Sequence, residues 1–164
     1  MVFVHANSAS RVQACSYLPV ALSLGCSLFA FDCGGSGVSD GQHVSLGWWE
    51  ADDLHAALSH LRRRGDVGPL VVWGHSMGAA AVIYYQGRYG APGRRAPRVD
   101  ACVLDSPYAD FGELARHLVK QNSKAATGGL CTYVAGFTLT QMALDMVLDG
   151  AITNLYLQDA VFCA

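Results

Sequence analysis

Four short, continuously apolar runs recur along the first two thirds of the chain, and longer segments of helical spacing separate them. The runs are Val2–His5, Ser27–Phe31, Pro69–Trp73 and Asp100–Leu104. Apolar runs of this length without polar alternation are typical of strands that are buried on both faces of a sheet. Strands separated by helices predict an α/β fold, here a three-layer sandwich with a mainly parallel sheet.

The segments between and after these runs have helical periodicity. Trp48–Arg64 places apolar residues on one face and acidic residues in its first turn, where the helix dipole favours them. Arg11–Leu24 has the same spacing, but Pro19 predicts a kink or a break. The remaining predicted helices are the Ala-rich segment that ends near Tyr89, then Phe111–Lys124 and Tyr133–Leu148.

Composition excludes several classes of function. The chain has 164 residues, of which 52% are hydrophobic and 15% charged, so it is too apolar for a disordered protein and long enough for one domain. A net charge of −2 gives no basis for a nucleic-acid partner. The six cysteines contain no C-x-x-C pair and predict small buried side chains in a reducing, cytoplasmic compartment. The most apolar window, Gly129–Leu148, contains Gln141 and Asp145, so we expect no membrane span.

Polar residues follow each apolar run, and in a parallel sheet the chemistry lies at the carboxyl ends of the strands. The third run leads into Gly74-His75-Ser76-Met77-Gly78, which matches G-x-S-x-G, and a helix follows. A sharp strand-to-helix turn exposes a serine hydroxyl and requires small flanking residues. We therefore predict that Ser76 is a catalytic nucleophile. The alternative is a helix-capping serine in a glycine turn.

Acyl transfer also needs two N–H donors aimed at the developing oxyanion. We expect one from Met77, the residue after the nucleophile, and the other from the loop after the first apolar run, at Asn7. The alternative is an ordinary strand-to-helix loop in which Ser10 caps the helix.

At these residues the chain resembles the α/β-hydrolase superfamily, in the branch of serine aminopeptidase-like (S33-like) and Bem46-like hydrolases. The resemblance rests on ordered landmarks: His5-Ala6-Asn7-Ser8, Phe31–Gly41, Leu46–Leu54, Gly74–Gly78 and Leu104–Pro107. The family usually has Gly where this chain has Ala6, so we expect the extra methyl group to affect the backbone of that loop.

The family's triad has the chain order Ser, then an acid, then His. The one histidine after Ser76 is His117, which falls in the middle of a predicted helix and is interpreted as a helix-surface residue. His5 and His75 are interpreted as structural residues beside the site. Asp105, at the end of the fourth run, is a weak candidate for the acid, and a structural role is favoured. The triad acid and base are therefore left unassigned.

The resemblance implies two strands before Val2 and further strand–helix units after residue 164, so we expect a partial, truncated α/β-hydrolase fold. Residues 1–110 would form the hydrolase core, and residues 111–164 a helical cap-like region with a divergent C-terminal end. The implied function is a serine hydrolase that acts on an ester, thioester or amide bond through an acyl-serine intermediate.

The expected substrate is a small molecule or a peptide or lipid ester, and no metal or cofactor is implied. Because the base is missing, this fragment is expected to be inactive or nearly so. The alternative function is a non-catalytic binding or scaffold protein that retains the hydrolase sheet. The oligomeric state is left open.

Overall fold

The computed structural model describes residues 1–91, 93–108, 110, 112 and 114–116. One compact unit spans Met1–Pro107. Along the chain its elements are β1 (Val2–Val4), the 3-10 helix η1 (Arg11–Ser16), α1 (Leu18–Ser23), β2 (Phe29–Ala30), α2 (Glu50–Arg64), β3 (Val71–His75), α3 (Met77–Tyr89) and β4 (Ala101–Asp105).

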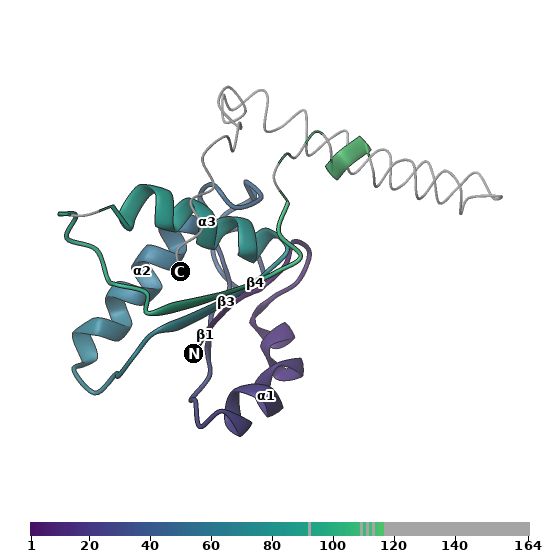
Figure 1. The fold of residues 1–164 in the computed structure, drawn as a ribbon. Coiled ribbons are helices and arrows are strands. Elements are labelled where there is room, and N and C mark those ends of the chain that lie inside the picture. Colours follow the sequence, from purple (N-terminus) through teal and green to yellow (C-terminus); the bar gives the residue numbers. More distant parts are fainter. Residues whose placement is uncertain (92, 109, 111, 113, 117–164) are drawn as a thin grey trace. The chain divides into compact units, whose positions relative to one another are not determined.

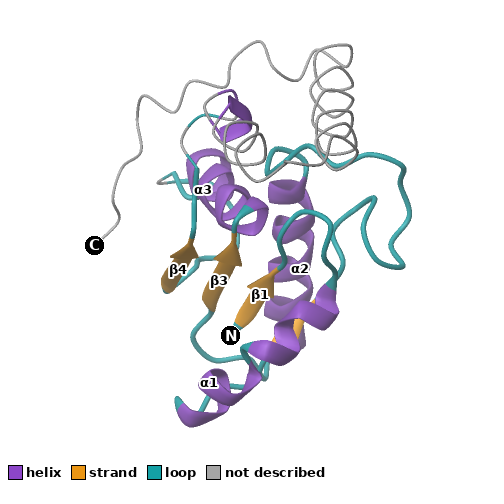
Figure 2. Ribbon diagram, turned by 90° about the vertical axis from the view of Figure 1, so that its right-hand side faces the viewer, coloured by secondary structure: helices purple, strands orange, loops and turns teal. Residues whose placement is uncertain are grey.

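The four strands form one parallel sheet in the order β2-β1-β3-β4. Helices α2 and α3 cover one face of this sheet, and η1 with α1 lies on the other (Figures 1 and 2). The register places Val4 opposite Gly74 and His75 opposite Asp105, so the strands β1, β3 and β4 end at the same edge. The predicted three-layer α/β fold with a parallel sheet is confirmed.

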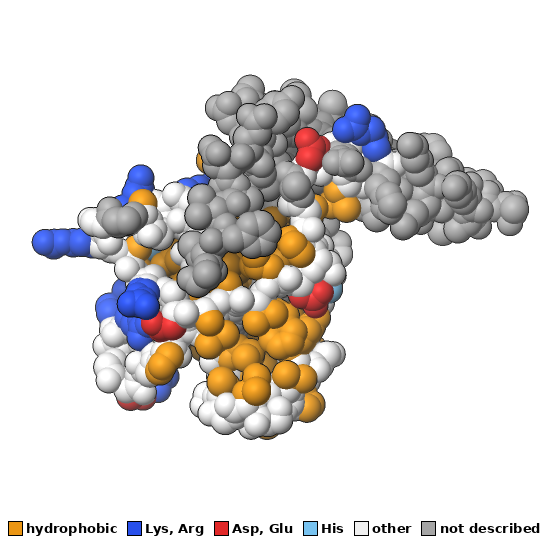
Figure 3. Space-filling view, in the orientation of Figure 1, with side chains coloured by type: hydrophobic (Ala, Val, Ile, Leu, Met, Phe, Trp, Pro, Cys, Tyr) orange, Lys and Arg blue, Asp and Glu red, His pale blue; other side chains and the backbone are white. Residues whose placement is uncertain are grey.

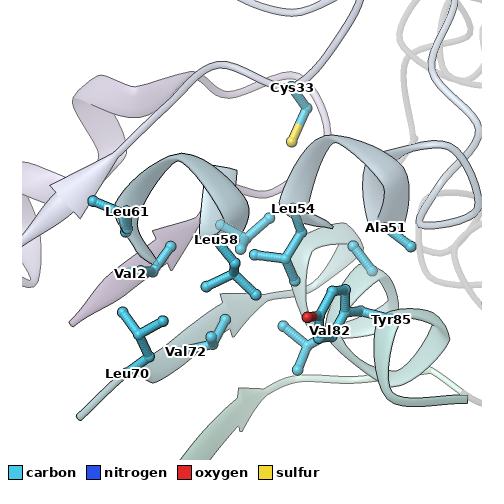
Figure 4. Close-up of a cluster of buried hydrophobic side chains, with 12 residues drawn as sticks. Val2, Cys33, Ala51, Leu54, Leu58, Leu61, Leu70, Val72, Val82 and Tyr85 are labelled. Atoms are coloured by element: carbon cyan, nitrogen blue, oxygen red, sulfur yellow. The ribbon is translucent and has the colours of Figure 1, made fainter. Parts of the chain in front are cut away.

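The main core lies between the sheet and the two helices α2 and α3 (Figure 4). Leu54 and Leu58 of α2 are completely buried there against Val72 of β3 and Tyr85 of α3. Complete burial of a leucine side chain stabilises the fold by about 1.5–3 kcal/mol. This face is the one that the helical spacing of Trp48–Arg64 predicts.

A smaller aromatic contact joins the opposite face of the sheet to the η1–α1 segment. The ring of Tyr17 lies 4.4 Å from that of Phe3 and 5.0 Å from that of Trp73, measured between centroids. Tyr17 stands between η1 and α1, so the predicted helix Arg11–Leu24 is divided there, and Pro19 lies in the first turn of α1. The break expected from the proline is confirmed.

The beginning of α2 is held by a buried carboxylate, that of Glu50. It accepts hydrogen bonds from the N–H groups of Ser45 (2.8 Å) and Gly47 (2.7 Å) and from the Ser45 hydroxyl (2.6 Å). These donors compensate the cost of burying the charge. Gly47 adopts φ +119°, and a Cβ atom there would lie 2.8 Å from the Cβ atom of Ala80 in α3. The carboxylate therefore fixes a loop that packs closely on the first turns of α3.

Two sequence predictions of buried side chains are wrong, one for the fourth apolar run and one for the cysteines. The fourth apolar run is not buried: Val103 and Leu104 are 37% and 41% exposed, and their strand β4 is at the edge of the described sheet. The cysteines are not uniformly buried either, since Cys33 is buried but Cys15 and Cys102 are exposed. Residues 131 and 163 lie outside the described part of the chain.

Figure 3 shows hydrophobic side chains gathered over α1 and the neighbouring part of the sheet. Those of α1 include Val20 and Leu22, which are 45% and 60% exposed. Among the described residues, no helix combines the length and the apolar character that a membrane crossing would require. The predicted helix at Tyr133–Leu148 and most of Phe111–Lys124 lie outside the described residues.

Candidate active site

Ser76 lies alone between the last residue of β3 and the first residue of α3. Its backbone has φ +52° and ψ −110°, a combination that L-residues rarely adopt and that costs about 1–3 kcal/mol. The Ser76 N–H donates to the carbonyl of Asp105 (2.8 Å), and its carbonyl accepts from the N–H of Ala80 (3.1 Å). Backbone hydrogen bonds on both sides thus hold the serine in this turn.

The two glycines around Ser76 allow the turn to be this tight. A Cβ atom at Gly74 would lie 2.4 Å from the carbonyl oxygen of Gly78, and one at Gly78 would lie 2.1 Å from the carbonyl oxygen of Val4. Neither position can hold a side chain without moving backbone. The contact with Val4 also places the start of α3 directly beside the end of β1 and the loop that follows it.

In that loop, the Ala6 N–H donates to the side-chain oxygen of Gln13 (2.8 Å). The donor at residue 6 is therefore already used within the protein. Ala6 is not among the residues with positive φ, so the methyl group that replaces the family's glycine causes no left-handed strain. Ser10 accepts a hydrogen bond from the Val12 N–H (3.4 Å) at the start of η1, as the capping alternative predicts.

His5 joins two loops at this edge of the sheet. Its ring is completely buried, Nδ1 lies 2.8 Å from the Ala6 carbonyl oxygen, and Nε2 accepts the Cys33 N–H at 3.0 Å. Because both ring nitrogens are occupied, His5 is a structural residue, in agreement with the sequence interpretation.

His75 and Asp105 lie side by side at the ends of β3 and β4. The imidazole Nδ1 is 2.9 Å from the Asp105 carboxylate, within ion-pair distance, but the two groups are not aligned as a hydrogen bond. The Ser106 hydroxyl donates to the second carboxylate oxygen at 2.9 Å, and the Tyr17 hydroxyl is 3.5 Å from the first. The contact with His75, followed by the hydrogen bond from Ser106, holds the pKa of Asp105 below its ordinary value. Burial, then the carboxylate, raises the pKa of Tyr17.

The glycine-rich loop after β2 is ordered by carboxylates. Asp32 accepts the N–H groups of Arg11 (2.6 Å) and Val38 (3.1 Å) and forms an ion pair with the Arg11 guanidinium. The Gly34 N–H donates to Asp53 at 2.8 Å. Glycine-rich loops can bind phosphate through free N–H groups, but here these N–H groups donate to carboxylates of the protein. The negative charge of Asp32 and Asp53 also opposes a phosphate.

The other described histidines contribute no visible base for Ser76. His55 stacks on Tyr89 at 4.2 Å, and His60 lines a cavity of about 400 Å³ whose walls include Phe29 and Phe31 but no residue of the 74–78 turn. Among the described residues, the Ser76 hydroxyl makes no hydrogen bond. His117 lies outside the described part of the chain.

Sequence reasoning missed the contact between His75 and Asp105 and the role of Gln13. The first depends on the register of β3 and β4, which pairs exactly these two residues. His75 and Asp105 follow shortly after the third and fourth apolar runs, which are consecutive in the sequence, and this signal could have suggested the contact. Nothing in the sequence singles out Gln13.

A parallel sheet of this order, with a serine at a strained strand-to-helix turn, is the architecture of an α/β hydrolase. The family model described as the alpha/beta hydrolase fold matches residues 1–143. The chain therefore belongs to the α/β-hydrolase family, and its structure is a partial form of that fold.

The chain is also similar to individual proteins of known sequence. The uncharacterized protein YqkD of Bacillus subtilis is 28% identical over 69% of this chain and 36% of its own length. The α/β hydrolase domain-containing protein 17C of Homo sapiens is 30% identical, over 54% of this chain and 27% of its own length. The chain thus spans about a third of the length of such relatives. An esterase of Pyrococcus furiosus shares the fold, with a TM-score of 0.68 at 23% identity over 83% of this chain and 53% of the esterase.

Proposed function

We propose that this chain is the core of a serine hydrolase in which Ser76 attacks the carbonyl carbon of an ester, thioester or amide. The observation that carries the proposal is the strained backbone of Ser76, between β3 and α3, with glycines packed on backbone at both sides. Strain of this kind persists where the surrounding structure enforces it, and it lifts the hydroxyl out of the sheet.

In the proposed reaction, the serine oxygen forms a bond to the carbonyl carbon while the hydroxyl proton passes to a base. The carbonyl electron pair moves onto oxygen, and the oxyanion is bound by the N–H groups of Met77 and Asn7. Collapse of this intermediate expels the alcohol, thiol or amine and leaves an acyl-serine, which water then hydrolyses. Met77 is the first residue of α3, so its N–H has no acceptor within the helix. One such donor contributes about 10²–10³-fold in rate.

We propose ester substrates first, because the structural neighbour from Pyrococcus furiosus is an esterase. We also propose that the chain belongs to the serine aminopeptidase-like branch of the family. We further propose that residues 1–110 form a hydrolase core and residues 111–164 a cap-like region.

We expect the chain to turn over slowly. Among the described histidines, none forms a hydrogen bond with the Ser76 hydroxyl, and a serine without its base loses most of its advantage over water. The same observation favours the second candidate function, a non-catalytic binding or scaffold protein that retains the hydrolase sheet.

An acylation assay separates the two functions. The chain, Ser76→Ala and Ser23→Ala are each incubated with p-nitrophenyl acetate, while p-nitrophenolate release and intact mass are recorded. Ser23 is the matched control because its hydroxyl donates to the Val20 carbonyl in α1, outside the candidate site. The proposal predicts release and an acetyl adduct in the unmodified chain and in Ser23→Ala, and neither in Ser76→Ala. Equal release from all three folded proteins would favour the scaffold function.

A further inference from the structure

We propose that Asp105 is a positioning residue that holds the Ser76 turn, through its backbone and through His75. The inference rests on the proposed function in one respect, namely that the turn carries the nucleophile. It gives a specific role to a carboxylate for which the sequence favours a structural role of unspecified kind.

The first connection is made by the backbone. The Asp105 carbonyl accepts the Ser76 N–H at 2.8 Å, one step beyond the register pair formed by His75 and Asp105. This hydrogen bond extends the ladder between β3 and β4 up to the residue whose φ is +52°. Displacing the end of β4 would therefore move the serine directly.

The second connection is made by the side chains. The Asp105 carboxylate contacts Nδ1 of His75, the residue that immediately precedes Ser76. The two groups lie 2.9 Å apart, within ion-pair distance, at the end of the β3–β4 ladder. The contact fixes the orientation of the ring and, with it, the last residue of β3.

Neighbouring groups hold the carboxylate itself in place. Tyr17 reaches it from the η1–α1 layer, and its ring also lies 6.3 Å from that of His75. Ser106 donates to the other oxygen. Side chains from the η1–α1 segment, from the end of β3 and from Ser106 thus meet at Asp105. Their contacts hold the serine turn in place.

The role is positioning rather than catalysis, because the Asp105 carboxylate contacts His75, Tyr17 and Ser106, and no contact joins it to the Ser76 hydroxyl. If Asp105 positions the turn, replacing it should change the turn in ways that can be measured without any substrate. Those effects should be absent when a carboxylate at the other end of the same strand is changed.

The test compares Asp105→Asn with Asp100→Asn. Asp100 precedes β4, accepts the Leu70 N–H at 2.8 Å and pairs with Arg62, so it anchors the same strand at its opposite end. Amide hydrogen exchange at Ser76, ¹⁵N signals of the His75 ring and the rate of labelling by a fluorophosphonate probe are measured on the full chain. Circular dichroism verifies that each variant is folded.

The expected result is that Asp105→Asn accelerates exchange of the Ser76 amide several-fold, shifts the ¹⁵N signals of the His75 ring, and slows labelling about tenfold. Asp100→Asn should leave all three unchanged. Unaltered exchange and ring signals in folded Asp105→Asn would overturn the inference. Failure of the unmodified chain to label would instead contradict the proposed nucleophile, since exchange and ring signals do not depend on it.

Discussion

The glycines around Ser76 shape the candidate site as much as its side chains do. Ser76 adopts an unfavourable conformation because Gly74 and Gly78 let three backbone segments approach each other closely. The strain of one residue, about 1–3 kcal/mol, is small beside the burial of several core side chains in β1, β3 and α3. The fold can therefore maintain a turn that the serine by itself would not adopt.

Gly78→Ala should destabilise the chain by about 1–3 kcal/mol, because the added methyl group would lie 2.1 Å from the Val4 carbonyl oxygen. Gly87→Ala is the matched control in the same helix, since no heavy atom lies within 4 Å of an added Cβ atom there. That substitution should be stabilising by about 0.5–1 kcal/mol. Urea denaturation of both variants measures the difference. Equal free energies of unfolding would mean that the start of α3 does not pack on β1.

At the scale of elements, helix ends were more predictable than strand ends. The helix α2 ends at Arg64, as its three terminal arginines predict, and Gly65 follows with φ +75°. The third strand was predicted at Pro69–Trp73 but runs from Val71 to His75, because pairing with β4 continues through Gly74 and His75. Glycine and histidine carry little strand signal of their own, and only the neighbouring strand reveals that they are paired.

The candidate site also has features that the sequence predicts and features that it does not. The serine turn was predictable because its requirements are local: a strand, small residues and a helix in sequence. The contact of His75 with Asp105 and the capture of the Ala6 N–H by Gln13 depend on which distant elements meet. Glu50 shows the same limit, since the sequence predicts an acidic residue in the first helical turn, while its burial follows from the loop folded over it.

Asp32 connects two elements and makes that connection dependent on pH. Burial acts to raise the pKa of Asp32, but the N–H donors of Arg11 and Val38 and the Arg11 guanidinium outweigh it, so the pKa lies below its ordinary value. A lowered pKa in the folded state contributes stability above the ordinary pKa of an aspartate, about 4, and that stability is lost as the pH falls through the folded-state pKa.

Asp32→Asn should therefore be less stable than the unmodified chain at pH 7, and the difference should shrink as the pH falls below about 4. Thermal unfolding recorded across this range measures it. Asp40→Asn, in the same loop, is the control, because the Asp40 carboxylate makes no hydrogen bond among the described residues. A difference between Asp32→Asn and the unmodified chain that stays constant down to low pH would contradict this account.

At the scale of the molecule, the Met1–Pro107 unit has one well-covered face and one that is less covered. The helices α2 and α3 bury the first face, whereas Val103 and Leu104 of β4 and several apolar residues of α1 remain exposed. A sheet edge with exposed apolar side chains and unpaired backbone groups favours association between chains.

Val103→Lys should consequently lower the concentration-dependent association of the chain, because a charge on an edge strand opposes strand pairing. Val38→Lys is the control: it adds the same charge at a loop residue that is 77% exposed. Sedimentation velocity over a range of concentrations compares the three proteins. Equal association in all of them would show that β4 is not the associating surface.

The account depends most on Ser76 being a nucleophile, and mass-spectrometric mapping after treatment with a fluorophosphonate tests this directly. Attack by the serine oxygen on phosphorus expels fluoride and leaves a stable phosphonyl group. Cleavage after Arg64 and Arg88 yields a peptide in which Ser76 is the only serine. We expect one phosphonyl group per chain, on Ser76. A folded chain that remains unlabelled, or that carries the group on another residue, would contradict it.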